Sequence, residues 1–296
     1  MKKSIRKLAA ILLAAVFTVY QLPAAVSADA TAFHDVAGHW GEAHLVKLIE
    51  AGVMIGDGNG KAMPDRELQG SEAAVMLAKI FGIDVLSLDE ALTGYFRTGS
   101  VVSREEAFVT IRKVFQIPDA PVSFTSAFPD YNNVSWGAED HLLAMEYAGM
   151  ISGKNGKIAP KDAVTRAEFA ALLSKGIGDF IDKNADFANA EMRNTLIRKP
   201  GVTVENLTVE QLTVARGAGS GSILLQNCDI GTLHIGGGGE IHLINTNVTE
   251  LIVNAPQTGH VRIVIDADSL VERLIQISET TVDGEVFELE DKTGNL

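Results

Sequence analysis

The spacing of the apolar residues changes near residue 200, and this change divides the 296-residue chain into two parts. Between residues 29 and 180 apolar residues recur every three or four positions, which is the period of an amphipathic helix. After Pro200 they alternate with polar residues in β-branched runs broken by Gly, Asn and Pro, as in short strands. The sequence therefore predicts a multidomain α plus β protein. The expected helices are 41–50, 71–81, 104–115, 136–147 and 166–175, with a weaker one at 86–92.

The second part repeats a short pattern, V-x-x-L-x-V, in steps of 21, 18 and 23 residues. A period near 20 predicts the coils of a short parallel β-solenoid, because one such coil is too small to bury a core alone. A small antiparallel sandwich is the alternative. We expect about four coils and a stack of asparagines at the turns. The pattern begins at Val209, Ile230, Val248 and, imperfectly, Val271, and the turn residues are Asn206, Asn227 and Asn245.

The first part contains an internal repeat. One copy covers about residues 33–82 and another about 128–177, with Phe-x-Asp, Trp-Gly, Ala-Gly, Asn-Gly-Lys, Pro and Glu in the same order. Residues 83–117 hold a degenerate middle copy, which keeps the second half of the pattern but has no Trp. Together the copies define a helical domain at 29–180, followed by a partly helical linker at 181–200, the solenoid at 201–290 and a tail at 291–296.

One charge in the last copy stands where helix stability disfavours it. Thr165 and Glu168 have the spacing of a capping box, so Arg166 falls in the first helical turn, where the dipole already makes the potential positive. That position costs a few tenths of a kcal/mol, roughly, and a bound anion would reverse the sign. Arg104, between Ser103 and Glu106, repeats the arrangement. The alternative is a solvated arginine or an ion pair within the helical bundle.

The order Phe-x-Asp-Val, His-Trp, Gly-Val/Met, Pro and Thr-Arg-Ala-Glu resembles the S-layer homology (SLH) module. The resemblance implies a pseudo-threefold helical bundle that holds exported proteins non-covalently to anionic, often pyruvylated, cell-wall polysaccharides. The first copy departs from the pattern, because Gly70 stands where the last copy has Arg166. A charged site is therefore not expected there.

The candidate glycan-binding residues follow from this resemblance and from the repeat. For the arginines the binding role is favoured, whereas the tryptophans could equally pack in the core. The glycines are expected to permit turns with positive φ. Asp35 and Asp130 are expected to be structural anchors. The candidates are Arg166, Arg104, Trp136, Trp40, Gly153, Gly56 and Glu168.

The first 28 residues have the features of a secretory signal peptide: a basic start, an apolar run and small residues before Asp29. Their removal lowers the formal charge from −13 to −17, since they carry four basic and no acidic residues. So acidic a chain is a poor candidate for binding nucleic acid. No later segment is apolar enough to span a membrane, and the lone Cys228 excludes an internal disulfide.

No catalytic residue, metal or cofactor is expected. Asp266 and Asp268 lack partner acids in neighbouring coils, and GDGNGK at 56–61 fits a turn better than a calcium loop. The histidines have the wrong spacing for a metal site.

The sequence therefore predicts a secreted cell-surface protein, anchored through its SLH modules to the envelope of a Gram-positive cell. The solenoid would serve for display, spacing or assembly, by self-association or with another surface protein. The alternatives are an envelope glycan-processing enzyme that uses the solenoid face, and an SLH-derived protein–protein assembly module.

Overall fold

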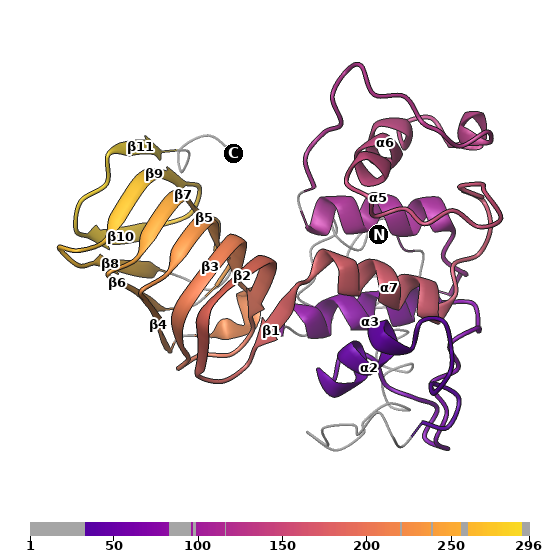
Figure 1. The fold of residues 1–296 in the computed structure, drawn as a ribbon, viewed down its shortest axis with the longest axis horizontal. Coiled ribbons are helices and arrows are strands. Elements are labelled where there is room, and N and C mark those ends of the chain that lie inside the picture. The colour runs from indigo at the N-terminus through magenta and orange to yellow at the C-terminus, as the bar shows by residue number, and fades with distance from the viewer. Residues whose placement is uncertain are drawn as a thin grey trace, which may run out of the picture.

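A computed structural model describes residues 33–82, 96, 99–115, 117–219, 221–237, 239–255 and 260–291. These residues form a helical part and a β-solenoid that lie side by side and meet near β1 (Figure 1). The predicted signal peptide, the weaker helix at 86–92 and the tail after residue 291 lie outside the described residues.

The helical part confirms the five main helices that the sequence period predicts, with bounds that differ by at most three residues. Among the described residues they are α2 (Glu42–Glu50), α3 (Gly70–Ile80), α5 (Arg104–Val114), α6 (Glu139–Tyr147) and α7 (Arg166–Gly176).

Capping boxes open α5 and α7, as the sequence predicts. The Glu168 N–H donates to Thr165 Oγ1 at 3.2 Å, and the Thr165 N–H donates to Glu168 Oε2 at 2.8 Å. Ser103 and Glu106 repeat this pair of bonds at the start of α5. Each box supplies partners for N–H groups that a helix start leaves unpaired.

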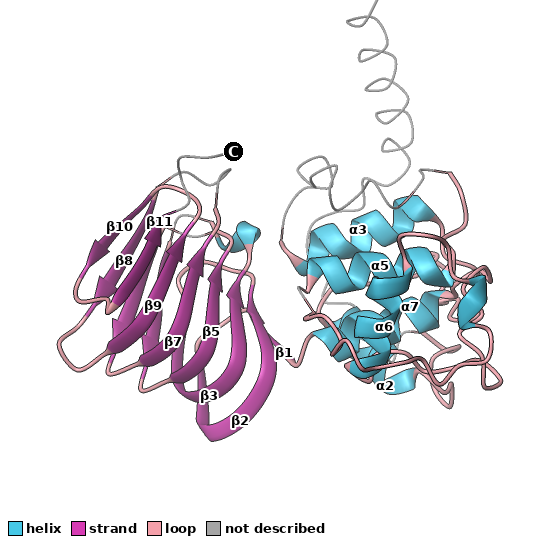
Figure 2. Ribbon diagram, turned by 90° about the horizontal axis from the view of Figure 1, so that it is seen from above, coloured by secondary structure: helices cyan, strands magenta, loops and turns pink. Residues whose placement is uncertain are grey.

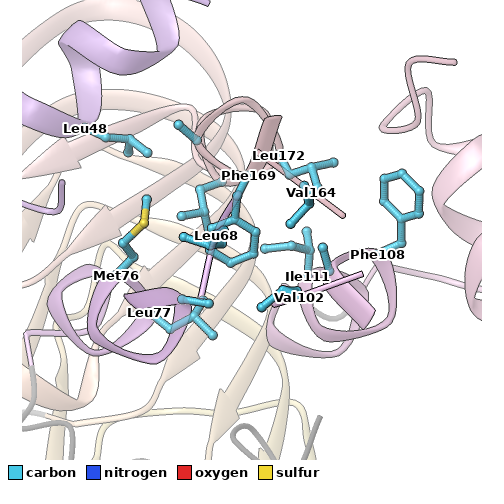
Figure 3. Close-up of a cluster of buried hydrophobic side chains, with 14 of the residues drawn as sticks. Leu48, Leu68, Met76, Leu77, Val102, Phe108, Ile111, Val164, Phe169 and Leu172 are labelled. Carbon is cyan, nitrogen blue, oxygen red and sulfur yellow. The ribbon is translucent and has the colours of Figure 1, made fainter. Parts of the chain in front are cut away.

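The residues before α3, α5 and α7 meet in a closed ring of three backbone hydrogen bonds. The Leu68 N–H donates to Val164 O, Val164 to Val102 O, and Val102 back to Leu68 O, each at 2.9 Å. All three side chains are buried, and Figure 3 shows them in one cluster with Phe169 and Ile111. The ring joins three segments about 34 and 62 residues apart in sequence around one core.

The solenoid is built from parallel strands, which excludes the antiparallel sandwich. One row contains β2, β3, β5, β7, β9 and β11, and the other contains β4, β6, β8 and β10 (Figure 2). The two rows make about six turns, more than the four expected, because the coils begin before residue 200. The strands after this point are β3 (Thr203–Val214), β4 (Ser222–Gln226), β5 (Asp229–Ile235), β6 (Glu240–Ile244), β7 (Asn247–Val253), β8 (Val261–Ile265), β9 (Leu270–Gln276), β10 (Thr280–Asp283) and β11 (Glu288–Asp291).

The strand register confirms the V-x-x-L-x-V repeat. Leu212 lies beside Leu233, which lies beside Leu251, and each is buried in the solenoid core. The predicted asparagine stack is also confirmed: Asn227 Nδ2 donates to Asn206 Oδ1 at 3.3 Å, and Asn245 Nδ2 to Asn227 Oδ1 at 2.9 Å. All three asparagines have positive φ, a conformation that asparagine tolerates better than most residues.

The expected linker at 181–200 is wrong as a helical or free segment. It contains most of β2 (Ala185–Ile197), which pairs with β3, and β1 (Asp179–Ile181) pairs with β2. Arg198 then fixes the solenoid to the helical part, since its Nη1 donates to Ala51 O at 3.2 Å and to Lys79 O at 3.3 Å. These carbonyls lie at the C-terminal ends of α2 and α3.

Candidate functional site

Arg104 links the middle copy of the repeat to the last copy. It is 4% exposed. Its Nε donates to Ile158 O at 2.8 Å, Nη2 to Ser152 O at 3.2 Å, and Nη1 to Glu168 Oε1 at 2.8 Å. The guanidinium therefore binds both the loop and the capping glutamate of the next copy, and it lies 5.3 Å from the Phe108 ring centroid.

Arg166 makes the same link from the last copy to the first. It is also 4% exposed, and its Nε donates to Ala62 O at 2.9 Å and Nη2 to Ile55 O at 2.6 Å. Its Nη1 lies 3.1 Å from Glu72 Oε1, the carboxylate of the first copy's capping pair. The adjacent acid offsets the unfavourable helix dipole, which accounts for an arginine at the positive end of a helix.

The third link of this series is absent because Gly70 opens α3. Its backbone N–H donates to Ser100 O at 2.9 Å, just as Arg104 N–H donates to Asp162 O and Arg166 N–H to Arg66 O. The backbone positions are thus equivalent, and only the side chain is missing. Glu168, a predicted site residue, accepts from Arg104, so the described contacts of all three charged candidates lie within the protein. Their contact with a glycan stays a prediction.

The two tryptophans lie on the surface rather than in the core. Trp136 is 96% exposed and Trp40 is 63% exposed, with the Trp40 ring 5.3 Å from that of His39. An exposed indole is unfavourable in water and is suited to stacking against another flat, partly apolar surface. Of the two readings that the sequence left open, the structure excludes the core role.

Trp136 is adjacent to a polar cluster at the start of α5. Ser135 donates to Glu105 through its backbone N–H at 3.1 Å and its hydroxyl at 2.8 Å. Lys161 Nζ lies 2.6 Å from Glu105 Oε1 and also donates to Ser135 Oγ. Burial raises the pKa of Glu105, but these bonds from Lys161 and Ser135 outweigh it and lower the pKa below its usual value. The cluster is a carboxylate held ionised under an exposed lysine.

Trp40 lies at the start of α7 in the equivalent setting, with different chemistry. A Cβ atom at Gly41 would lie 3.5 Å from Ala167 Cβ, which places this loop against the first turn of α7. His39 Nε2 lies 3.2 Å from Asp65 Oδ1. Sequence reasoning missed both clusters; the signal lay at the position after the repeated proline, where Asp65 replaces Lys161.

Asp35 and Asp130 anchor the loops that the arginines bind, as predicted. Asp35 accepts the N–H groups of Ala62 and Met63, both at 2.8 Å, and Asp130 accepts those of the equivalent Ile158 and Ala159. Burial raises the pKa of each carboxyl, but the backbone N–H groups outweigh it and lower the pKa overall.

The prediction of positive φ at Gly56 and Gly153 is wrong. Neither glycine has positive φ. A Cβ atom at Gly56 would overlap the Phe33 ring and lie 2.5 Å from Lys61 O, and one at Gly153 would lie 2.6 Å from Phe128 Cε1. These glycines are needed because the first aromatic residue of each repeat packs directly on the backbone.

The other polar motifs have structural partners. Asp57 accepts from Asn59 N–H at 2.7 Å and from Lys61 N–H at 3.1 Å, as in a turn. Asp266 accepts from the Asn245 backbone and from the Ser269 hydroxyl. Within the part of the chain that the structure describes, no group of three or more His, Cys, Asp or Glu is placed to hold a metal ion. None of the described helices has the length and apolarity to cross a membrane.

Comparison with known families identifies the module that contains Trp136. Residues 127–170 match the family described as the S-layer homology domain, which confirms the predicted resemblance for this stretch. The stretch also contains Gly153, Arg166 and Glu168. The chain thus carries an SLH module in its helical part and a parallel β-solenoid after it.

Two curated proteins are similar to this chain. They are "S-layer protein" of Bacillus thuringiensis subsp. finitimus and "S-layer protein sap" of Bacillus anthracis, each 28% identical over 177 residues. The similar stretch covers 51% of this chain and 22% of each relative. The chain therefore matches about a fifth of the length of these relatives.

Proposed function

We propose that this protein is held at the bacterial cell surface by its helical part, which binds anionic wall polysaccharide. The observation that carries the proposal is the position of Trp136. It is almost fully exposed, and it lies within the stretch that matches the SLH domain. The names of the two relatives support an S-layer or cell-surface location.

We infer that the helical part is a pseudo-threefold bundle with two developed junctions between repeats. The ring of hydrogen bonds through Leu68, Val102 and Val164 supports this symmetry, as do the matched contacts of Arg104 and Arg166. A binding surface would form at each tryptophan, over the start of the helix that the neighbouring repeat contributes. The buried arginines would hold the loops of each junction in place, and Gly56 and Gly153 would let those loops pack closely.

The solenoid is proposed to present or space other parts of the protein above the wall. Its second partner would be another copy or a different surface protein, recognised through exposed strand faces. The proposed function is binding and structural. Asp266, the acid considered for catalysis, supports this view, since it caps a turn.

A sedimentation assay tests the anchoring role. Mature protein is mixed with Gram-positive sacculi, before and after mild acid extraction of the secondary polymers, and the pelleted fraction is measured. We expect wild type to pellet with unextracted walls only, and a Trp40→Ala, Trp136→Ala double variant to remain in solution. The conservative pair Trp40→Phe, Trp136→Phe keeps an aromatic face and should pellet partly. Equal pelleting of wild type with both wall preparations would contradict the proposal.

A further inference from the structure

The two tryptophan surfaces have the same backbone frame. Ala167 N–H donates to Pro64 O at 2.9 Å, and Glu105 N–H donates to Pro160 O at 3.0 Å. The residue after each proline therefore reaches the first turn of a helix from the neighbouring repeat, beside one exposed tryptophan. In the first copy that residue is Asp65.

In the last copy the equivalent residue is Lys161, and the two side chains have opposite charge. The Lys161 side chain is 54% exposed and pairs with Glu105, whose own side chain is largely covered. The Asp65 side chain is 81% exposed and contacts His39. Ala167 takes the place of Glu105 at the Trp40 surface, so that surface has lost the carboxylate that holds the lysine at the other.

The residues that follow do not restore the balance. Arg66, next to Asp65, pairs with Glu72, and Asp162, next to Lys161, pairs with Lys154 at 3.4 Å. A ligand at Trp136 thus meets an exposed ammonium group over a neutralised carboxylate. A ligand at Trp40 meets an exposed carboxylate. Because opposite charges attract by roughly 1 kcal/mol at about 4 Å even in bulk water, the same anion binds these surfaces differently.

We infer that Lys161 and Asp65 set the charge preference of the two surfaces. The Trp136 surface takes the anionic substituent of the wall polysaccharide, and the Trp40 surface takes an uncharged sugar of the same chain. This rests on the proposed carbohydrate binding. It makes the two repeats unequal receptors on one polymer, with specificity determined by a single position per repeat.

The chain contains two tryptophans, so each surface carries its own fluorescent reporter. Trp40→Phe leaves Trp136 as the reporter, and Trp136→Phe leaves Trp40. Each variant is titrated with pyruvylated secondary wall polysaccharide and with the same polymer after mild acid removal of the ketals. Far-UV circular dichroism checks that every variant is folded.

We expect ketal removal to weaken binding about tenfold at Trp136, and less than about twofold at Trp40. Adding Lys161→Gln should abolish most of the preference at Trp136, and adding Asp65→Lys should create one of about tenfold at Trp40. Lys183→Gln, which makes the same charge change at an exposed site in the β1–β2 connection, should leave both titrations unchanged.

Three results would overturn the inference: equal preference at both tryptophans, an unchanged preference in the Lys161→Gln variant, or no response at either reporter. The first two leave the proposed function standing, because binding is still observed. The third removes both, since neither surface would then bind the polymer.

Discussion

Replacement of Arg104 by methionine would remove one complete link between repeats while keeping a long apolar side chain. Ile158 O would lose its 2.8 Å donor in a buried setting, and Glu168 would lose its guanidinium partner. An unsatisfied buried acceptor costs about 1–3 kcal/mol, and breaking a mostly buried ion pair about 3–5 kcal/mol. Since the two losses overlap and Ser152 is exposed, we expect unfolding free energy to fall by about 3–5 kcal/mol.

Arg166→Met should cost less, by about 1 kcal/mol, because Glu72 retains Arg66 as a partner. Its side chain is also more exposed than that of Glu168, 29% against 18%, so water replaces part of what is lost. The order of the two variants, rather than either value alone, tests the described contacts.

Urea denaturation of the mature chain measures these losses, followed by fluorescence because both tryptophans lie in the helical part. Arg193→Met is the matched control: Arg193 is exposed on the solenoid, and its replacement should change stability by less than about 0.5 kcal/mol. If both test variants stay within about 1 kcal/mol of wild type, the arginines are not links between repeats and the reasoning fails.

Three further predictions concern the loops and the solenoid. Asp35 and Asp130 have lowered pKa values in the folded protein, so their stabilisation is present above about pH 4 and is lost as pH falls through the folded pKa; urea midpoints at pH 6 and pH 3 should converge in an Asp35→Asn, Asp130→Asn variant. Gly56→Ala should destabilise by about 1–3 kcal/mol and more than Gly153→Ala, because its new Cβ meets the Lys61 carbonyl as well as a ring, and thermal unfolding would show the order. Asn227→Ala should lower the solenoid melting temperature, whereas Asn227→Gly should recover the share due to positive φ but not the two hydrogen bonds of the ladder.

Local patterns predicted much of the fold. The helix period and the capping boxes identified α5 and α7 closely, because both signals lie within a few residues of one another. The solenoid register followed from one repeated motif, since Leu212 and its equivalents must share a face to be buried. Strand β2 was missed because its polar sequence has little strand propensity and takes its conformation from pairing with β3.

The site was harder to predict, because its contacts join residues far apart in sequence. The Glu105–Lys161 ion pair spans 56 residues, and Arg166 binds Ile55 across 111. The repeat correctly selected Arg104 and Arg166 as paired positions, but only the folded contacts reveal that each faces the capping glutamate of the next copy. For Gly56 the decisive neighbour is the ring of Phe33, which no local rule would identify.

Arg198 also determines how the solenoid is carried. Its guanidinium is 7% exposed, binds carbonyls at the ends of both α2 and α3, and is held in turn by Asp182. A positive charge in the first coil thus caps two helices at the negative ends of their dipoles. The solenoid and the helices consequently move as one lever, and the height of β11 above them is fixed by the stacking of coils. About six turns at about 4.8 Å each give a reach of about 30 Å.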